Sequence, residues 1–150
     1  MSMNRQWIAA HIPHQGGMCL LDEVLDWSAN GIRCRSGTHR LTDNPLRGGG
    51  RLDAICAIEY AAQSMAVHGA LIGTLTGSAP AAGYLASVRE VSLFRSRLDD
   101  LTADLVASST YLGGDDSAVL YQFSVTAADA VIANGRATII LNAARRARNS

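Results

Sequence analysis

The pattern of hydrophobic and polar positions divides this chain into two strands, a long helix and four further strands. Residues 18–39, MCLLDEVLDWSANGIRCRSGTH, contain two apolar runs that are joined at Ala29-Asn30-Gly31. Because Asn-Gly between apolar runs is a strong hairpin signal, this segment predicts two strands connected by a tight turn. Polar residues, Pro45 and three consecutive glycines then predict a loop over residues 40–51.

The next segment, from about Asp53 to Ile72, is predicted to be a helix. Gly69 and Gly73 suit its end, and residues 74–83, TLTGSAPAAG, predict a loop. Apolar residues cover most sides of this helix, which is typical of a helix buried in a core. Several small residues would allow a surrounding sheet to approach closely, namely Ala54, Ala57, Ala61, Ala62 and Ala66.

The second half of the chain predicts four strands, because Val, Ile, Thr, Tyr and Phe are enriched between turn signals. The expected strands are residues 84–98, 101–112, 117–129 and 130–143. Strands on both sides of one long helix indicate an α+β fold with an antiparallel sheet. We therefore expect a single domain over residues 1–150 with the hotdog fold, in which an antiparallel sheet wraps around one long central helix.

Composition and charge narrow the classes of function. The 13 basic residues, all of them arginine, balance the 13 acidic residues, so the formal net charge is zero. This balance gives no electrostatic reason to expect nucleic acid or an anionic membrane as the main partner. The 3 cysteines have no CxxC spacing, which argues against a disulfide framework and a metal site. We see no secretory signal and no membrane span, and therefore expect a soluble cytoplasmic protein.

One acidic residue, Glu59, stands within the apolar helix. Helix spacing places Glu59 on one stripe with Ile55 and Ala62, and Gln63 lies one turn further along the same side. A buried carboxylate has to be paired, hydrogen-bonded or protonated. Glu59 is therefore either a structural acceptor of hydrogen bonds or an acid–base group of an active site.

A run of three glycines, Gly48-Gly49-Gly50, precedes the helix. Backbone N–H groups at a helix N-terminus are unpaired and lie at the positive end of the helix dipole. Glycine also lets a ligand approach the backbone closely. The amides of Gly49, Gly50 and Arg51 could therefore bind the carbonyl oxygen of a thioester as an oxyanion hole. The alternative is a flexible surface loop, which has the same composition.

The segment IPHQGGMCLLDEVLDWSANG, followed by IEYAAQSMA, resembles the FabZ-type 3-hydroxyacyl-acyl-carrier-protein dehydratases over roughly residues 8–143. That family has a pattern like LPHRxPFLLVDRV, then EAMAQ on the central helix of a hotdog fold. The later segments GYLASVREVSLFRSRL and GRATIIL correspond to its third and last strands. The NPLR sequence, the short glycine-rich loop and IEYAAQ are more similar to the ApeP-like branch, which is linked to aryl polyene biosynthesis. The resemblance implies that Glu59 is the catalytic acid of the helix and that Gln63 is its companion in binding substrate.

The chain departs from the FabZ-type pattern at the catalytic histidine. Those enzymes carry it in a GHFP loop before the helix, where this chain has DNPLRGGGRLDAICAIE without histidine. His14 follows Pro13 and precedes the first strand, and in the family's fold that entry lies near the helix and the acyl tunnel. We therefore predict His14 as the catalytic base. His39 is the reserve candidate, and His68, near the end of the helix, is expected to be structural.

Three functions are compatible with these features. The resemblance implies a dehydratase that converts a 3-hydroxyacyl thioester to a trans-2-enoyl thioester in fatty acid, polyketide or aryl polyene biosynthesis. Its partner would be an acyl carrier protein with a phosphopantetheine-linked acyl chain, and it would need no cofactor. The alternatives are a hotdog thioesterase and a non-catalytic partner subunit of a heteromeric dehydratase. Because hotdog subunits usually pair, we expect a homodimer or a heteromer with a FabZ-type dehydratase.

Overall fold

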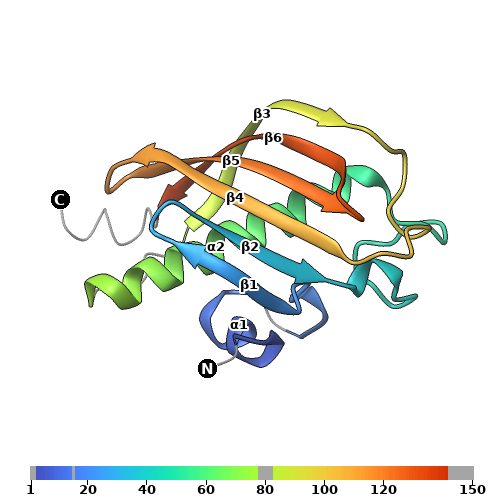
Figure 1. The fold of residues 1–150 in the computed structure, drawn as a ribbon, viewed down its shortest axis with the longest axis horizontal. Helices are drawn as coiled ribbons and strands as arrows, with labels where there is room; N and C mark the ends of the chain where they lie inside the picture. Colours follow the sequence, from blue (N-terminus) through green and yellow to red (C-terminus); the bar gives the residue numbers. More distant parts are fainter. Residues whose placement is uncertain (1–2, 15, 78–82, 142–150) are drawn as a thin grey trace.

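The fold is a six-stranded antiparallel sheet that curves around one long helix, as a computed structural model of the chain shows (Figure 1). The structure describes residues 3–14, 16–77 and 83–141. The strands are β1 (Glu23–Ser28), β2 (Gly31–Ser36), β3 (Gly83–Leu93), β4 (Leu105–Gly114), β5 (Ala118–Ala127) and β6 (Ala130–Leu141). Their order in the sheet is β1-β2-β4-β5-β6-β3, so β1 and β3 are its two edges. The predicted α+β class and the hotdog architecture are confirmed.

The predicted β1–β2 hairpin is present, with Ala29 and Asn30 in the turn and Ser28 paired with Gly31. The first strand nevertheless begins at Glu23 rather than near Met18. Residues 19–21 are apolar and buried, as in a strand, but the Leu20 N–H donates to a side chain of the central helix instead of to a neighbouring strand. An apolar run indicates burial, and here the buried run is not paired as a strand.

The strand at the opposite edge, β3, is shorter than predicted. It ends at Leu93, and the chain then leaves the sheet to bond with the segment that precedes the central helix. The Ala54 N–H donates to the Ser96 carbonyl at 3.0 Å, and the Leu98 N–H donates to the Leu52 carbonyl at 2.8 Å. These bonds fix the entry of the helix against the far end of β3.

A short helix near the N-terminus, α1 (Arg5–His11), was not predicted from the sequence. It begins after Asn4, whose side-chain oxygen accepts a hydrogen bond from the Trp7 N–H at 3.1 Å, as an N-cap does. Ile8 is its fully buried residue. Because Asn4 also forms a bridge with Glu23, α1 is attached to the β1 edge of the sheet.

The central helix, α2 (Ala57–Thr76), follows a 3-10 turn over Ala54–Cys56, close to the predicted start at Asp53. It does not end near Ile72 but continues to Thr76, and Gly77, with a φ of 70°, terminates it. Gly69 and Gly73 therefore lie within the helix and do not end it. The last turns are still packed in the core, where Ala70, Leu71 and Gly73 are buried. Part of the loop predicted over residues 74–83 is therefore helix, and residues 78–82 of it lie outside the described residues.

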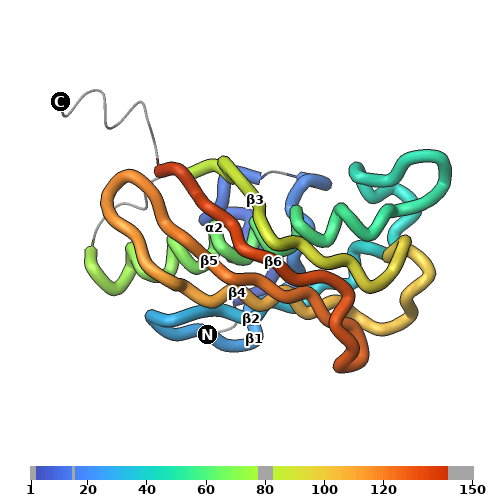
Figure 2. The backbone as a smooth tube through the Cα atoms, turned by 90° about the horizontal axis from the view of Figure 1, so that it is seen from above, coloured from blue at the N-terminus to red at the C-terminus, as the bar shows by residue number. Residues whose placement is uncertain are grey.

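Helix α2 lies along the inner face of the sheet and contacts β2, β4, β5 and β6 (Figures 1 and 2). By length and apolar composition alone, the segment Ala54–Thr76 could also cross a membrane. In this fold more than half of that segment is buried, as is usual for the core helix of a folded domain. The largest fully buried side chains of the core include Tyr60, Leu20, Leu21, Leu52, Leu98, Leu105, Phe123 and Ile132.

Candidate active site

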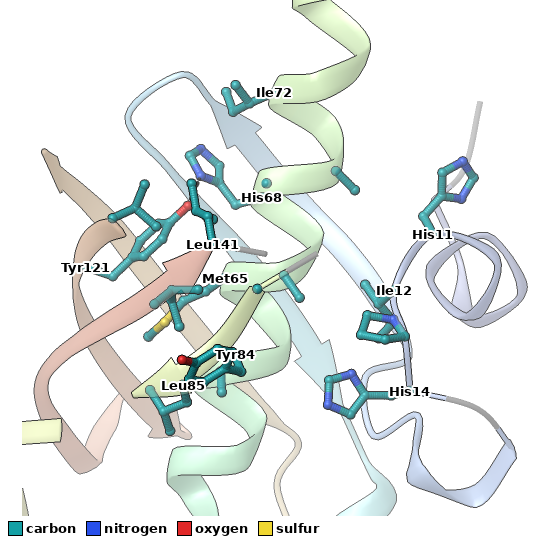
Figure 3. Close-up of a pocket in the computed structure, with 18 of the residues that line it drawn as sticks. His11, Ile12, His14, Met65, His68, Ile72, Tyr84, Leu85, Tyr121 and Leu141 are labelled. Atoms are coloured by element: carbon teal, nitrogen blue, oxygen red, sulfur yellow. Dashed lines mark hydrogen bonds between the residues drawn. The ribbon is translucent and has the colours of Figure 1, made fainter. Parts of the chain in front are cut away.

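A cavity of about 880 Å³ opens along one face of α2. The chain that follows α1 forms one side of it, and residues of β3, β4, β5 and β6 form the other side (Figure 3). Small residues on α2 leave the space free, because Ala62, Ala66 and Gly69 recur every three or four positions on one face. The other α2 residues that border the cavity are Glu59, Met65, His68, Ala70 and Ile72.

Glu59, the third residue of α2, faces this cavity. The sequence predicted that apolar neighbours would enclose it, but Ile55 is 53% exposed and Glu59 itself is only half-buried. Within the described part of the chain, the Glu59 carboxyl group takes part in no hydrogen bond and no ion pair. It is therefore free to contact a ligand in the cavity.

His14 borders the same cavity from the side opposite α2, and its ring is directed toward that helix (Figure 3). The Nδ1 atom is buried and has no hydrogen-bond partner among the described residues. A neutral imidazole has one donor and one acceptor nitrogen, and buried polar atoms are normally paired. The structure thus brings the two predicted catalytic residues, Glu59 and His14, to one cavity.

Gln63 is not among the residues that border the cavity, although it lies only one turn from Glu59. Its side chain is completely buried, and both ends of its amide are engaged. The Oε1 atom accepts a hydrogen bond from the Leu20 N–H at 2.9 Å, and the Nε2 group donates to the Met18 carbonyl at 2.7 Å. Gln63 therefore holds the segment that follows His14 against α2, instead of lying where a substrate in the cavity would contact it.

Gly49, Gly50 and Arg51 lie in a tight turn outside the cavity. Gly48 and Arg51 exchange two backbone hydrogen bonds, of 2.9 and 3.1 Å, and the two glycines between them have φ values of 60° and 76°. This is the conformation of a two-residue hairpin turn that glycine favours. The turn precedes the start of α2 at Ala57 by several residues, and Arg51 bonds with Asp53 and the Ser96 carbonyl. Within one chain these amides are not brought to Glu59, and their contact with a thioester stays a prediction.

The remaining histidines differ in their surroundings. His39, the reserve candidate for the base, is completely buried away from the cavity, where its Nε2–H donates to the Leu101 carbonyl at 3.0 Å. Burial lowers the pKa of His39, which favours its neutral form. His11 borders the cavity but is exposed, stacks on Trp7 and donates from Nδ1 to the Trp7 carbonyl. Neither residue has the orientation expected of a base acting with Glu59.

His68 also borders the cavity, which the sequence did not predict. Its Nε2–H donates to the Ser28 carbonyl at 2.8 Å, so Nδ1 is the acceptor of the Tyr121 hydroxyl at 2.7 Å. Burial lowers the pKa of His68 and raises the pKa of Tyr121, so both groups are neutral near neutral pH. His68 is thus hydrogen-bonded to two strands of the sheet, and its structural role stays a prediction. Its place in the cavity was missed because nine residues, about two and a half helical turns, separate it from Glu59. This spacing puts the two residues on opposite sides of the helix.

The arrangement combines acid–base groups with an apolar enclosure. A carboxyl group and an imidazole ring border the cavity near the start of α2, and mostly apolar side chains border the rest of it. Within the described residues, no group of three or more His, Cys, Asp or Glu residues could hold a metal ion. By itself, the site can transfer protons to and from a bound, largely apolar ligand.

Comparisons with known proteins agree with this fold. Residues 6–147 match the model of the ApeP-like family, which is described as ApeP dehydratase. Among curated proteins, none matches the chain. Among solved structures, the chain is similar to the dehydratase heterocomplex ApeI:P from Xenorhabdus doucetiae, with a TM-score of 0.83, 22% sequence identity, and 95% of each chain covered.

More distant structural relatives share the fold alone. Zebra fish thioesterase superfamily member 2 has a TM-score of 0.61 and 16% identity, with 92% of this chain and 95% of that chain covered. The E. coli PaaI protein from the phenylacetic acid degradation operon has a TM-score of 0.58 and 10% identity, with 78% of this chain and 80% of that chain covered. Because the family model spans nearly the whole length of the sequence, the chain belongs to the ApeP-like dehydratase family.

Proposed function

We propose that this chain provides the acid–base site of a dehydratase that eliminates water from a 3-hydroxyacyl thioester carried by an acyl carrier protein. The observation that carries the proposal is that Glu59 and His14 border one largely apolar cavity, with the Glu59 carboxyl group and the His14 Nδ1 atom unpaired among the described residues. Membership in the ApeP-like dehydratase family supports the same chemistry.

Elimination of water needs one group that removes a proton and another that supplies one. In the proposed reaction His14 takes the proton from C2, and the electrons of that C–H bond form the C2–C3 double bond. The C3–O bond breaks as protonated Glu59 gives its proton to the departing hydroxyl group, which leaves as water. The imidazole of histidine suits the first step because its charge changes near neutral pH. Transfer of the proton from His14 back to Glu59 through solvent restores the site.

The apolar part of the cavity would hold the acyl chain and keep water away from the reacting carbons. Its volume of about 880 Å³ lies within the range of small-molecule sites, which is about 300–1,000 Å³. Excluding water strengthens the interactions of the two catalytic groups with the substrate, because fewer competing dipoles surround them. The mostly apolar lining is the reason for assigning an acyl chain, and not a polar metabolite, to the cavity.

A second candidate function is that of a partner subunit in a heteromeric dehydratase. The solved relative from Xenorhabdus doucetiae is part of a dehydratase heterocomplex, which favours pairing with a FabZ-type dehydratase. Strand β3 offers the surface for pairing, because it is an edge of the sheet and exposes Tyr84 and Leu93, with Phe94 just beyond it. The first residues of β3 also border the cavity, so a subunit paired there would close the site.

Intact-mass measurement of carrier-protein substrates separates these functions. The purified chain is incubated with 3-hydroxyacyl carrier proteins, alone and with a FabZ-type partner from the same source. If the chain is self-sufficient, the isolated protein removes one water, and Glu59→Gln and His14→Ala each lower kcat by about a hundredfold or more. His11→Ala is the matched control, because His11 also borders the cavity but bonds to its own helix, and turnover should persist.

The other outcomes identify the alternatives. Activity that requires the partner and does not change in His14→Ala would assign this chain the helper role. Full activity of the isolated His14→Ala protein would remove His14 from the mechanism. Release of free acid and thiol would instead identify a thioesterase, in which Glu59 acts without a histidine.

A further inference from the structure

One glycine, Gly69, lies inside α2 where the helix borders the cavity. A glycine within a helix is destabilising relative to alanine, so it normally has a physical reason. The usual reasons are a positive φ or a neighbour that leaves no room for a Cβ atom. Neither applies to Gly69: its φ is not positive, and a Cβ there would have none of the described atoms within 4 Å. At Gly135 of β6, by contrast, a Cβ would come within 2.9 Å of the Phe123 ring.

The space that Gly69 leaves free belongs to a continuous stripe of the cavity. Four α2 residues that border the cavity follow one another at intervals of three, four and three positions, namely Glu59, Ala62, Ala66 and Gly69. This spacing places them within an arc of about 80° on the helix surface. The lining does not end at Gly69, because Ile72, nearly one turn further along α2, also borders the cavity (Figure 3). The carboxyl group and the three small residues therefore lie along one open face of α2.

The stripe can be compared with the length of an acyl chain. In the proposed reaction Glu59 gives its proton to the oxygen on C3, so C3 lies level with Glu59. A rise of 1.5 Å per residue places Ala62, Ala66 and Gly69 about 4.5, 10.5 and 15 Å further along the axis. An extended chain advances about 1.2 Å per bond, as the extended polypeptide does over its three bonds per residue. A chain parallel to α2 would therefore pass these residues at about carbons 7, 12 and 15.

We propose that the acyl chain lies along this stripe of α2, directed from Glu59 toward Ile72, and that the small size of Ala62, Ala66 and Gly69 determines the chain lengths accepted. The inference rests on the proposed function, which supplies the acyl ligand and the position of C3. A large side chain at any of the three positions would occupy the volume that the chain needs there. Each position should therefore block the chain at a different, calculable carbon.

Leucine substitutions along the stripe, read out with ligands of graded length, test the proposal. The probes are S-(3-hydroxyalkyl) pantetheine thioethers, which lack the carbonyl group and so can be neither dehydrated nor hydrolysed. Calorimetry with the full-length protein then measures the fit of the chain apart from catalysis. If the protein is stable only with a partner subunit, the same unmodified partner accompanies every variant. In the unmodified protein the affinity should rise about fourfold per methylene, equivalent to about 0.8 kcal/mol, and continue to rise past about 15 carbons.

The three variants should limit this rise in the order of their positions. Affinity should stop rising near 7 carbons in Ala62→Leu, near 12 in Ala66→Leu and near 15 in Gly69→Leu, with about fourfold weaker binding than to the unmodified protein for each further methylene. Probes shorter than each limit should bind as they do to the unmodified protein. Thr74→Leu is the matched control, because Thr74 is an exposed residue of α2 that does not border the cavity, and its profile of affinity against length should not change.

Each outcome decides a separate question. If the unmodified protein binds no thioether of any length, the proposed function fails and the inference fails with it. If thioethers bind but the three variants share the profile of the unmodified protein, or limit it in another order, the inference alone is overturned. Equal weakening of all lengths in Gly69→Leu, together with a lower mass in light scattering, would overturn it in favour of a paired subunit that covers the stripe. If Gly69→Leu does not fold, Ala62→Leu and Ala66→Leu decide, since equal or reversed limits there would overturn it.

Discussion

Replacing Gln63 by leucine should release the segment after His14 from α2. Leucine has nearly the shape of glutamine, so Gln63→Leu removes two hydrogen bonds without creating a large cavity. The buried Leu20 N–H loses its acceptor, which costs about 1–3 kcal/mol. The Met18 carbonyl belongs to a residue that is 42% exposed, so water can replace its lost donor, and its contribution is smaller, about 1 kcal/mol. We expect a total loss of about 2–4 kcal/mol in the free energy of unfolding.

Urea unfolding measures this loss. Trp7 in α1 and Trp27 in β1 lie on either side of the released segment, so their fluorescence reports on it while circular dichroism reports on the whole fold. For a chain of 150 residues, a loss of about 2–4 kcal/mol corresponds to a fall of about 4–16 °C in Tm. Protein concentration has to be the same for all variants, because association also affects the apparent stability.

The neighbouring residue supplies the control. Ser64 is also completely buried, but its hydroxyl bonds to the Ala61 carbonyl and to Ser109, far in sequence from residues 18–20. Ser64→Ala should cost about 1 kcal/mol and leave dehydration of the carrier-protein substrate unchanged. Gln63→Leu should lose both stability and turnover, because His14 is no longer held near Glu59. Stability within about 0.5 kcal/mol of the unmodified protein, together with full turnover, would refute the positioning role of Gln63.

Gln63→Glu sharpens the same test through pH. The introduced carboxylate would face the Met18 carbonyl oxygen in a buried site, and both effects raise its pKa above the ordinary range. The stability of this variant should therefore be highest at acid pH, where the carboxyl group is protonated and can donate to Met18, and should fall as the pH rises. A difference from the unmodified protein that does not depend on pH would contradict the geometry of this hydrogen bond.

Three further predictions follow from other parts of the structure. Burial lowers the pKa of both His39 and His68, so the unfolded chain binds more protons below about pH 6.5, and the free energy of unfolding should fall there. Urea unfolding as a function of pH checks this, and a flat profile down to about pH 5 would contradict it. Gly50→Ala, at a φ of 76°, should destabilise the protein by about 1 kcal/mol in thermal melting, whereas Gly48→Ala, with no positive φ, should not. Light scattering at micromolar concentration should show at least a dimer because of the free edge of β3, and a monomer would contradict the pairing.

The elements of the fold followed from the sequence where one local signal dominated. Asn30-Gly31 placed the β1–β2 turn, and the apolar run with Ala at many positions placed α2. Helix α1 was missed because seven residues are too few for a periodic pattern, although its N-cap, Asn4, is a recognisable signal. The end of α2 was placed too early because Gly69 and Gly73 were read as terminators, and only their neighbours in the fold show that the helix continues past them.

The site was predicted less completely because identical residues serve different purposes. Glycines are required both in a loop that lies close to a ligand and in a turn with positive φ, and Gly49 and Gly50 satisfy the second requirement. Helix spacing placed Gln63 beside Glu59, and they are indeed one turn apart. The side chains nevertheless diverge, because residues 18–20 cover the position of Gln63 and leave that of Glu59 open to the cavity. Contacts of this kind join residues more than 40 positions apart, and no local pattern contains them.

The polar residues of α2 explain why an apolar helix carries a carboxyl group. Gln63 bonds to the segment after His14, Ser64 bonds to β4, and His68 bonds to β1 and β5. These three residues therefore fix the rotation and the axial position of the helix against four different parts of the fold. Glu59 makes no such bond within the described residues, yet it lies where Ala62, Ala66 and Gly69 leave open space. A structural carboxyl group would be placed where donors satisfy it, so an unpaired one beside a cavity favours the acid–base function over the structural one.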